Sequence, residues 1–168
     1  MSLLTSAVAA VILDSAGRVL LCQQSQGHRL WGLPGGRIRN QESPVHAVIR
    51  DIREETGTET DVVDLVGLYH LTADGWDADL PDVLMHVFRG RVVDGDLAVN
   101  APGRICRLSW HDASSLPEPM TATARVAIAD AIAGRSGVLR DVHRDAEPEI
   151  ADADELDLVE DEELVAAG

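Results

Sequence analysis

The chain has 168 residues, a length that fits one domain with a terminal extension better than two domains. It carries 29 acidic against 14 basic residues, a formal net charge of −15, and no basic patch interleaved with aromatic residues, which argues against a nucleic acid polymer as partner. The longest apolar run, residues 6–13, is too short to cross a bilayer and lacks the basic flank of a secretory signal, so we expect no membrane partner and a cytoplasmic location.

The first part of the chain predicts two strands and a glycine loop. Residues 5–13 form a buried apolar run typical of a strand, residues 14–17 are typical of a turn, and residues 19–24 are predicted to be the hairpin partner of the first strand. The breaker cluster Pro34-Gly35-Gly36 then predicts a tight loop before the next element.

A helix is predicted from Pro44 to Thr56. Ser43 suits an N-cap followed by proline at the first helical position, and Gly57 suits the left-handed residue that ends a helix. Spacings of i, i+3, i+4 and i+7 predict a core-facing stripe made of Val45, Val48, Ile49 and Ile52.

The remaining elements complete an α/β fold. Strands are predicted at 62–71, 83–93 and 104–110, a short helical turn at 112–116 and a final helix at 120–133. Strands flanked by one early and one late helix predict a mixed sheet between helices, an α/β/α sandwich.

Acidic residues concentrate at the C-terminus. From Arg144 onward there are eleven acidic residues and one arginine, a local charge of −10. We therefore expect a folded domain over residues 1–140 and an acidic tail over 141–168, either helical at 152–166 or disordered. The tail is also a candidate to dock a basic partner or a second protomer, so a homodimer is possible.

Three carboxylates gather on the predicted helix. Asp51, Glu54 and Glu55 lie at i, i+3 and i+4, on one arc that we expect to point away from the apolar stripe. Such a cluster repels itself unless a cation neutralises it, and hard oxygen ligands suit Mg²⁺. Arg50 is four residues before Glu54 and is close enough to orient it. The alternative is an ordinary solvated helix face.

The residues before the helix support a functional interpretation of this cluster. Gly35 and Gly36 permit a tight loop whose backbone can approach a metal ion or a phosphate closely. Glu42 adds a carboxylate beside the helix N-terminus, where a favourable interaction with the helix dipole is the alternative role.

The stretch from Gly36 to Thr58 resembles the Nudix box, G-x5-E-x7-R-E-U-x-E-E-x-G-U, where U is aliphatic. The positions that match this pattern are Gly36, Glu42, Arg50, Ile52, Glu54, Glu55 and Gly57. The order of strands, glycine loop and helices over residues 3–135 also agrees with the fold of that family.

The resemblance implies a hydrolase that cleaves a diphosphate linkage in a nucleoside diphosphate joined to another group, with Mg²⁺ or Mn²⁺ as cofactor. It implies catalytic roles for Arg50, Asp51 and Glu54. It also implies metal ligation by the carboxylates of Asp51, Glu54 and Glu55, with help from a glycine carbonyl at Gly35. The metal would neutralise the leaving diphosphate and activate the attacking water.

Asp51 departs from the family pattern, which has glutamate there. The aspartate side chain is shorter by about 1.5 Å, and a misplacement of about 1 Å can cost a hundredfold in rate. Thr58 replaces an aliphatic residue, which we expect only to soften packing.

The loop before the last predicted strand is a third departure. Many family members carry a further glutamate there, but residues 100–103 contain no acid. Asp77, Asp79 and Asp82 are the candidates to replace it.

Substrate contacts are predicted at Trp76, which lies in a loop and could stack on a base, and at Arg37, beside the glycine loop. We expect a small-molecule substrate: a nucleoside triphosphate, an oxidised dNTP or a nucleotide sugar. The competing hypothesis is a Nudix-fold sensor that binds a nucleotide without hydrolysing it. Asp51 and the missing loop acid favour this hypothesis, and the intact Arg50, Glu54 and Glu55 oppose it.

Overall fold

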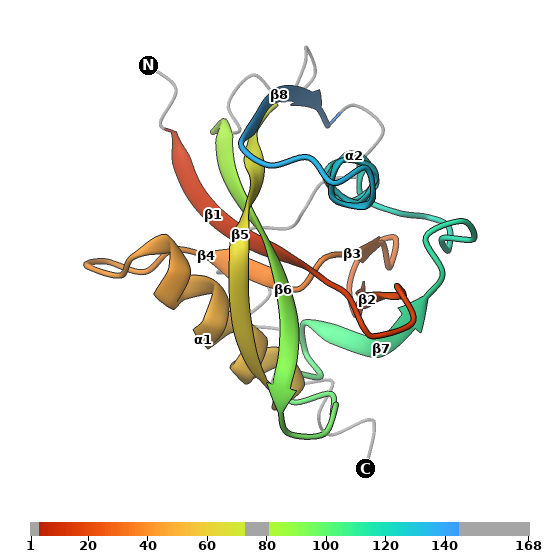
Figure 1. The fold of residues 1–168 in the computed structure, drawn as a ribbon. Coiled ribbons are helices and arrows are strands. Elements are labelled where there is room, and N and C mark those ends of the chain that lie inside the picture. Colours follow the sequence, from red (N-terminus) through yellow and green to blue (C-terminus); the bar gives the residue numbers. More distant parts are fainter. Residues whose placement is uncertain (1–3, 73–80, 145–168) are drawn as a thin grey trace.

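The computed structural model describes residues 4–72 and 81–144. In chain order the elements are β1 (Thr5–Ile12), β2 (Val19–Gln24), β3 (Trp31–Gly32), β4 (Gly35–Arg37), α1 (Pro44–Thr56), β5 (Glu59–Thr72), β6 (Val83–Asp94), β7 (Ile105–His111), α2 (Ala122–Ile132) and β8 (Val138–His143), as labelled in Figure 1. Within these described ranges no helix is long and apolar enough to span a membrane.

The main sheet has five strands in the order β4-β1-β6-β5-β8. It is mixed, because β1 runs parallel to β6 and β5 parallel to β8, whereas the β1–β4 and β5–β6 pairs are antiparallel. The register sets Gly35 opposite Ala9 and Gly36 opposite Val8, so the glycine segment is hydrogen-bonded along β1. A second, antiparallel sheet has the order β3-β2-β7.

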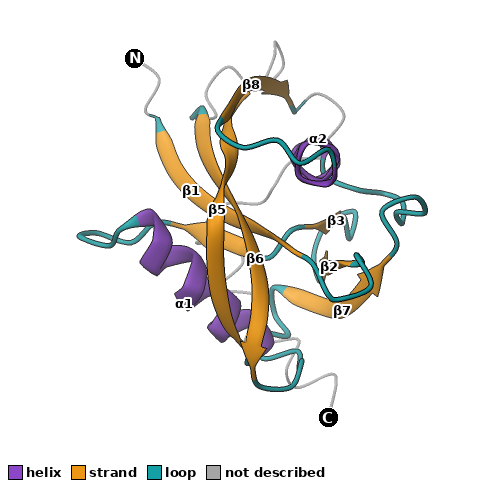
Figure 2. Ribbon diagram, in the orientation of Figure 1, coloured by secondary structure: helices purple, strands orange, loops and turns teal. Residues whose placement is uncertain are grey.

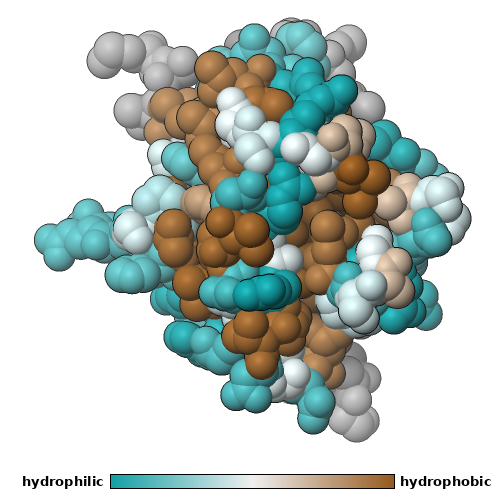
Figure 3. All heavy atoms as spheres, viewed as in Figure 1, coloured by the Kyte–Doolittle hydropathy of each residue, from teal (hydrophilic) through white to brown (hydrophobic). Residues whose placement is uncertain are grey.

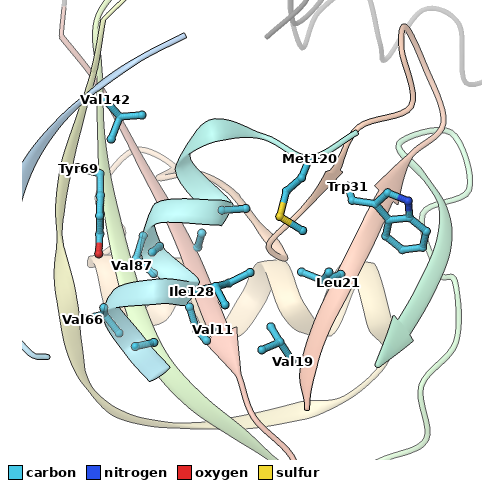
Figure 4. Close-up of a cluster of buried hydrophobic side chains, with 14 of the residues drawn as sticks. Val11, Val19, Leu21, Trp31, Val66, Tyr69, Val87, Met120, Ile128 and Val142 are labelled. Carbon is cyan, nitrogen blue, oxygen red and sulfur yellow. The ribbon is translucent and has the colours of Figure 1, made fainter. Parts of the chain in front are cut away.

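The two helices lie on opposite faces of the main sheet (Figure 2). Successive side chains of β1 alternate between two cores, as expected for a strand buried on both faces. Val8 and Ile12 pack with Val48 and Ile52 of α1. The other core joins β1, α2 and the second sheet, and Figure 4 labels its main side chains: Val11, Val19, Leu21, Trp31, Val66, Tyr69, Val87, Met120, Ile128 and Val142. The predicted α/β/α sandwich with a mixed sheet is confirmed.

Three elements differ from the sequence predictions. The strand at 19–24 is not the hairpin partner of β1, because β1 is flanked by β4 and β6, and the two strands share only the bridge between Leu13 and Val19. Residues 112–116 form a turn held by Asp112, not a helix. The strand β8, which no pattern predicted, pairs with β5, and the boundary expected at residue 140 falls inside it.

The buried face of α1 is also different from the predicted stripe. Val48 and Ile52 are fully buried, but Val45 is 41% exposed. Asp51 and Glu55 lie on the buried side instead, only 2% and 4% exposed, so the carboxylates do not point away from the protein interior as expected. The reason is the glycine segment of β4, which covers this side of the helix and contacts the carboxylates.

Candidate active site

The glycine segment brings backbone against the carboxylates of α1. A side chain at Gly35 would collide with the backbone carbonyl of Val8, because this residue is pressed against β1. A Cβ atom at Gly36 would lie 3.0 Å from Oδ2 of Asp51. At Gly35 only glycine allows this close approach, in which its N–H donates to Oε2 of Glu55 at 3.2 Å.

The ends of α1 fix where its carboxylates lie. The hydroxyl of the N-cap Ser43 accepts the N–H of His46, and Gly57 ends the helix with a left-handed φ of 74°. Between these caps Asp51 and Glu55 are buried, whereas the side chain of Glu54 is 34% exposed. The helix therefore carries two buried carboxylates and one that is partly exposed to solvent.

Arg50 is the hub of an ionic network around these groups. It donates two hydrogen bonds to Glu42, at 2.6 and 2.8 Å, one to Asp51 at 2.8 Å and one to Glu54 at 3.2 Å. These bonds from Arg50 lower the pKa of Glu42 to about 2 and raise the pKa of Arg50 itself. Because one guanidinium holds three carboxylates, it fixes the geometry of the helix surface.

The two buried carboxylates are poorly compensated. Oδ2 of Asp51 is buried without a hydrogen-bond partner, and burial raises the pKa of this residue although Arg50 opposes the shift. Burial, together with the charge of Asp51, raises the pKa of Glu55 to about 8. The positive charge of Arg104 acts in the opposite direction on both groups. Buried anions with raised pKa values are typical of sites that bind a cation or move a proton.

The donor set fits a hard divalent cation. In the described ranges no three histidine, cysteine, aspartate or glutamate side chains are already gathered as a metal-binding group. However, the orphaned Oδ2 of Asp51 and the mutual repulsion of Asp51 and Glu55 are features that a cation would relieve. Carboxylate and backbone carbonyl oxygens are the ligands such cations prefer, and the backbone of Gly35 lies close enough to Glu55 for its N–H to donate to Oε2.

Other predicted residues have different positions. Arg37 is exposed at the end of β4, and its carbonyl accepts a hydrogen bond from Arg50 at 3.2 Å. Asp82 lies 3.0 Å from His70, so its carboxylate is engaged there. Three predicted residues lie outside the described ranges: Trp76, Asp77 and Asp79.

Two arginines near the carboxylates were missed by sequence reasoning. Arg39 donates to both oxygens of Glu54, each at 3.2 Å, and Arg104 acts electrostatically on Asp51 and Glu55. Arg39 occupies a variable position of the box pattern, so no signal marked it. For Arg104 the signal was available, because this cation directly follows the loop that lacks the expected acid.

Thr58 was expected to soften packing, but it is fully buried and its hydroxyl is satisfied. The hydroxyls of Thr56 and Thr58 are 2.7 Å apart, and that of Thr56 donates to the carbonyl of Ile52 at 2.6 Å. This local pair accommodates the polar residue at an aliphatic position.

A family model described as the NUDIX domain matches residues 3–131. The chain belongs to the Nudix family. Its relatives include a MutT-like protein of Streptomyces ambofaciens, 28% identical over 127 residues that cover 76% of this chain and 76% of the relative. A solved MutT Nudix hydrolase from Burkholderia pseudomallei has a TM-score of 0.69 at 27% identity, covering 76% of this chain and 98% of that one.

Matches to other curated Nudix proteins are shorter. A CTP pyrophosphohydrolase of Escherichia coli K12 is 35% identical over 71 residues, which cover 40% of this chain and 53% of the relative. The chain spans only 29% of the length of a relative from Caenorhabditis elegans. These matches support the family assignment of the domain.

Proposed function

We propose that this Nudix protein hydrolyses a diphosphate linkage in a nucleoside diphosphate derivative, with Mg²⁺ or Mn²⁺ bound on α1. The observation that carries the proposal is the pair of buried, under-compensated carboxylates, Asp51 and Glu55, beside a glycine backbone. A buried anion is costly unless it is paired, so a site that keeps two of them side by side is suited to a cation.

Each residue of the site has a definite task in this proposal. Asp51, Glu54 and Glu55, with the carbonyl of Gly35, hold the cation, which when bound neutralises the diphosphate and acidifies a water molecule. Arg50 keeps Asp51 and Glu54 in position through its hydrogen bonds at 2.8 and 3.2 Å. Asp51 and Glu54 are the candidates to accept the proton of the attacking water.

The substrate class is proposed from chemistry and from relatives. The acidic site repels a bare polyphosphate, so the substrate must bind together with the cation or form contacts with an arginine. Arg37 is exposed, and its carbonyl accepts a hydrogen bond from Arg50 of the site. The relative named for CTP supports a nucleoside triphosphate, and oxidised dNTPs and nucleotide sugars remain in the same chemical class. Trp76 is the proposed base-stacking residue.

A metal-dependent hydrolysis screen tests this function. The panel contains nucleoside triphosphates, oxidised dGTP, nucleotide sugars, ADP-ribose and dinucleoside polyphosphates, each with Mg²⁺ and with Mn²⁺. We expect turnover of one class, and a loss of more than about a hundredfold in Glu55→Gln, because ligand loss should exceed the effect of changing an outer residue. Full turnover in Glu55→Gln would refute the proposed site.

A nucleotide sensor is the second candidate, and the position of Arg104 favours it. Many family members carry an acid in the loop before the last strand, whereas here that loop has none and is directly followed by Arg104, whose positive charge acts on Asp51 and Glu55. A cation in the site can bind phosphate without activating water. Nucleotide binding by calorimetry without turnover of any substrate in the screen would select the sensor.

A further inference from the structure

Two arginines, Arg39 and Arg50, donate hydrogen bonds to the carboxylate of Glu54. Both carboxylate oxygens of Glu54 accept from the Arg39 guanidinium, at 3.2 Å each, and Oε2 also accepts from Arg50 at 3.2 Å. A carboxylate has about four lone-pair positions, and three of those on Glu54 are therefore occupied. Oε2 must give up a hydrogen bond before it can ligate a cation.

Burial identifies which of these hydrogen bonds is the easier to exchange. The side chain of Arg39 is 61% exposed, whereas that of Arg50 is 16% exposed and is held by Glu42 as well. An exposed ion pair contributes little net free energy, because water competes for both partners. The Arg39–Glu54 pair is thus the replaceable part of the network, and the Arg50 contacts are the fixed part.

The loop that carries Arg39 keeps it beside the site even when the pair is broken. The backbone N–H of Arg39 donates to Oε1 of Glu42 at 3.1 Å, and Glu42 is anchored by Arg50. The loop between β4 and α1 projects from the molecule and is hydrophilic on its surface (Figure 3). A guanidinium released from Glu54 therefore stays within a side-chain length of the carboxylates and faces solvent.

We propose that Arg39 is an exchangeable substrate-binding residue, which covers Glu54 when no cation is bound and transfers to a phosphate oxygen of the nucleoside diphosphate when Glu54 ligates the cation. The inference deepens the proposed function and rests on it. Glu54 would exchange the guanidinium of Arg39 for a divalent cation as its counter-charge, because the two positive charges would repel each other. The planar fork of arginine matches two oxygens of a phosphate as well as two of a carboxylate, so one side chain serves both states.

The first experiment measures Mn²⁺ binding by electron paramagnetic resonance, without nucleotide, in wild type and Arg39→Gln. Removal of the competing ion pair should tighten Mn²⁺ binding about two- to fivefold, the range that an exposed ion pair supports. The matched control is Arg53→Gln, which breaks the exposed pair between Arg53 of α1 and Glu59 of β5 and should leave the Mn²⁺ affinity unchanged. Mn²⁺ binding in Arg39→Gln that is equal to wild type or weaker would refute the proposal that Arg39 competes with the cation for Glu54.

The second experiment measures phosphate contact. With Mn²⁺ present, Arg39→Gln should weaken binding of a non-hydrolysable nucleoside diphosphate analogue about tenfold or more, since a charge-assisted hydrogen bond is lost. Arg39→Lys should lose less, because it keeps the charge but not the fork. An analogue affinity equal to wild type in Arg39→Gln would overturn the transfer.

Both measurements are independent of turnover. A protein that hydrolyses nothing in the screen would refute the proposed hydrolase and still report on Arg39 through these two affinities. Melting temperatures of the variants, compared with Arg53→Gln, verify that the fold is intact.

Discussion

In the described part of the chain each helix carries a buried aspartate that contacts arginine, and the surroundings of these two aspartates are opposite in kind. On α2, Asp130 is 1% exposed and accepts hydrogen bonds from Tyr69 at 2.8 Å, from Arg135 at 2.9 Å and twice from Arg140, at 2.6 and 2.7 Å. On α1, Asp51 is equally buried but keeps an unpartnered oxygen.

The pKa values of the two clusters record this difference. Hydrogen bonds from Arg140 hold the pKa of Asp130 well below its usual range, whereas burial raises the pKa of Glu55 to about 8. Asp130 is a satisfied anion that ties α2 to β5 and β8. Asp51 and Glu55 are under-satisfied carboxyl groups, which are typical of sites that bind a ligand or move a proton.

The largest expected effect is on the satisfied cluster. Asp130→Asn should lower the free energy of unfolding by about 3 kcal/mol, because it removes the charge that Arg135 and Arg140 share and breaks a buried ion pair. Urea denaturation measures this change. Asp61→Asn, which breaks the exposed pair with Arg91, is the control and should cost under about 0.5 kcal/mol. Similar costs for both variants would contradict the assignment of Asp130 as a structural anchor.

The opposite sign is expected on α1. In the metal-free protein at pH 8, Glu55→Gln should raise the free energy of unfolding by about 2 kcal/mol, because a buried, poorly paired charge is replaced by a neutral amide of the same shape. The folded-state pKa of Glu55 is raised from 4.5 to about 8, so the folded state binds more protons than the unfolded state between these values. The contribution of Glu55 to stability is therefore full below about pH 4.5 and falls as the pH rises towards 8.

The measurement is the difference between wild type and Glu55→Gln in denaturation with EDTA at pH 5, 6.5 and 8. The free energy of unfolding of the variant, relative to that of wild type, should increase from each pH to the next. Mg²⁺ should reduce this difference by stabilising the wild type. A difference that does not change with pH would mean that Glu55 is already well compensated.

Sequence patterns predicted the parts of the fold that local rules control. The caps Ser43 and Gly57 and the box spacing placed α1 correctly, since capping and helix periodicity act within a few residues. The strand β8 was missed because its pairing with β5 joins distant segments and its residues Arg140 and Asp141 interrupt the apolar pattern. The placement of β2 in a second sheet likewise depends on pairing between distant segments, which local sequence patterns do not predict.

The residues of the candidate site could be named from the sequence, but how deeply they are buried could not be predicted. The box spacing grouped Asp51, Glu54 and Glu55 on one arc, yet periodicity gives a direction and not the degree of burial, which the glycine segment of β4 decides. Arg39 could not be predicted, because a long exposed side chain reaches its partner from a position without any pattern.

An effect of intermediate size on turnover is expected when Asp51, which departs from the Nudix box pattern, is replaced by the longer glutamate. Asp51→Glu restores the family residue, but here the aspartate lies against Gly36 and is 2% exposed, so the longer side chain has no free space. We expect kcat to fall about tenfold, since crowding displaces the carboxylate by about half an ångström. Steady-state kinetics with the substrate found in the screen measures this, and a rise in kcat would show that the aspartate is a handicap.

The smallest effect separates the partners within the Asp130 cluster. Arg135 gives one hydrogen bond at 2.9 Å from a side chain that is 54% exposed, whereas Arg140 gives two shorter ones. Arg135→Gln should therefore lower the free energy of unfolding by only about 0.5 kcal/mol. Arg140→Gln is the matched comparison in the same urea experiment and should cost more. Equal losses would mean that Asp130 is stabilised by the total positive charge of the surrounding arginines and not by the geometry of their hydrogen bonds. Asp130 and Asp51 would then differ in how much positive charge surrounds each of them.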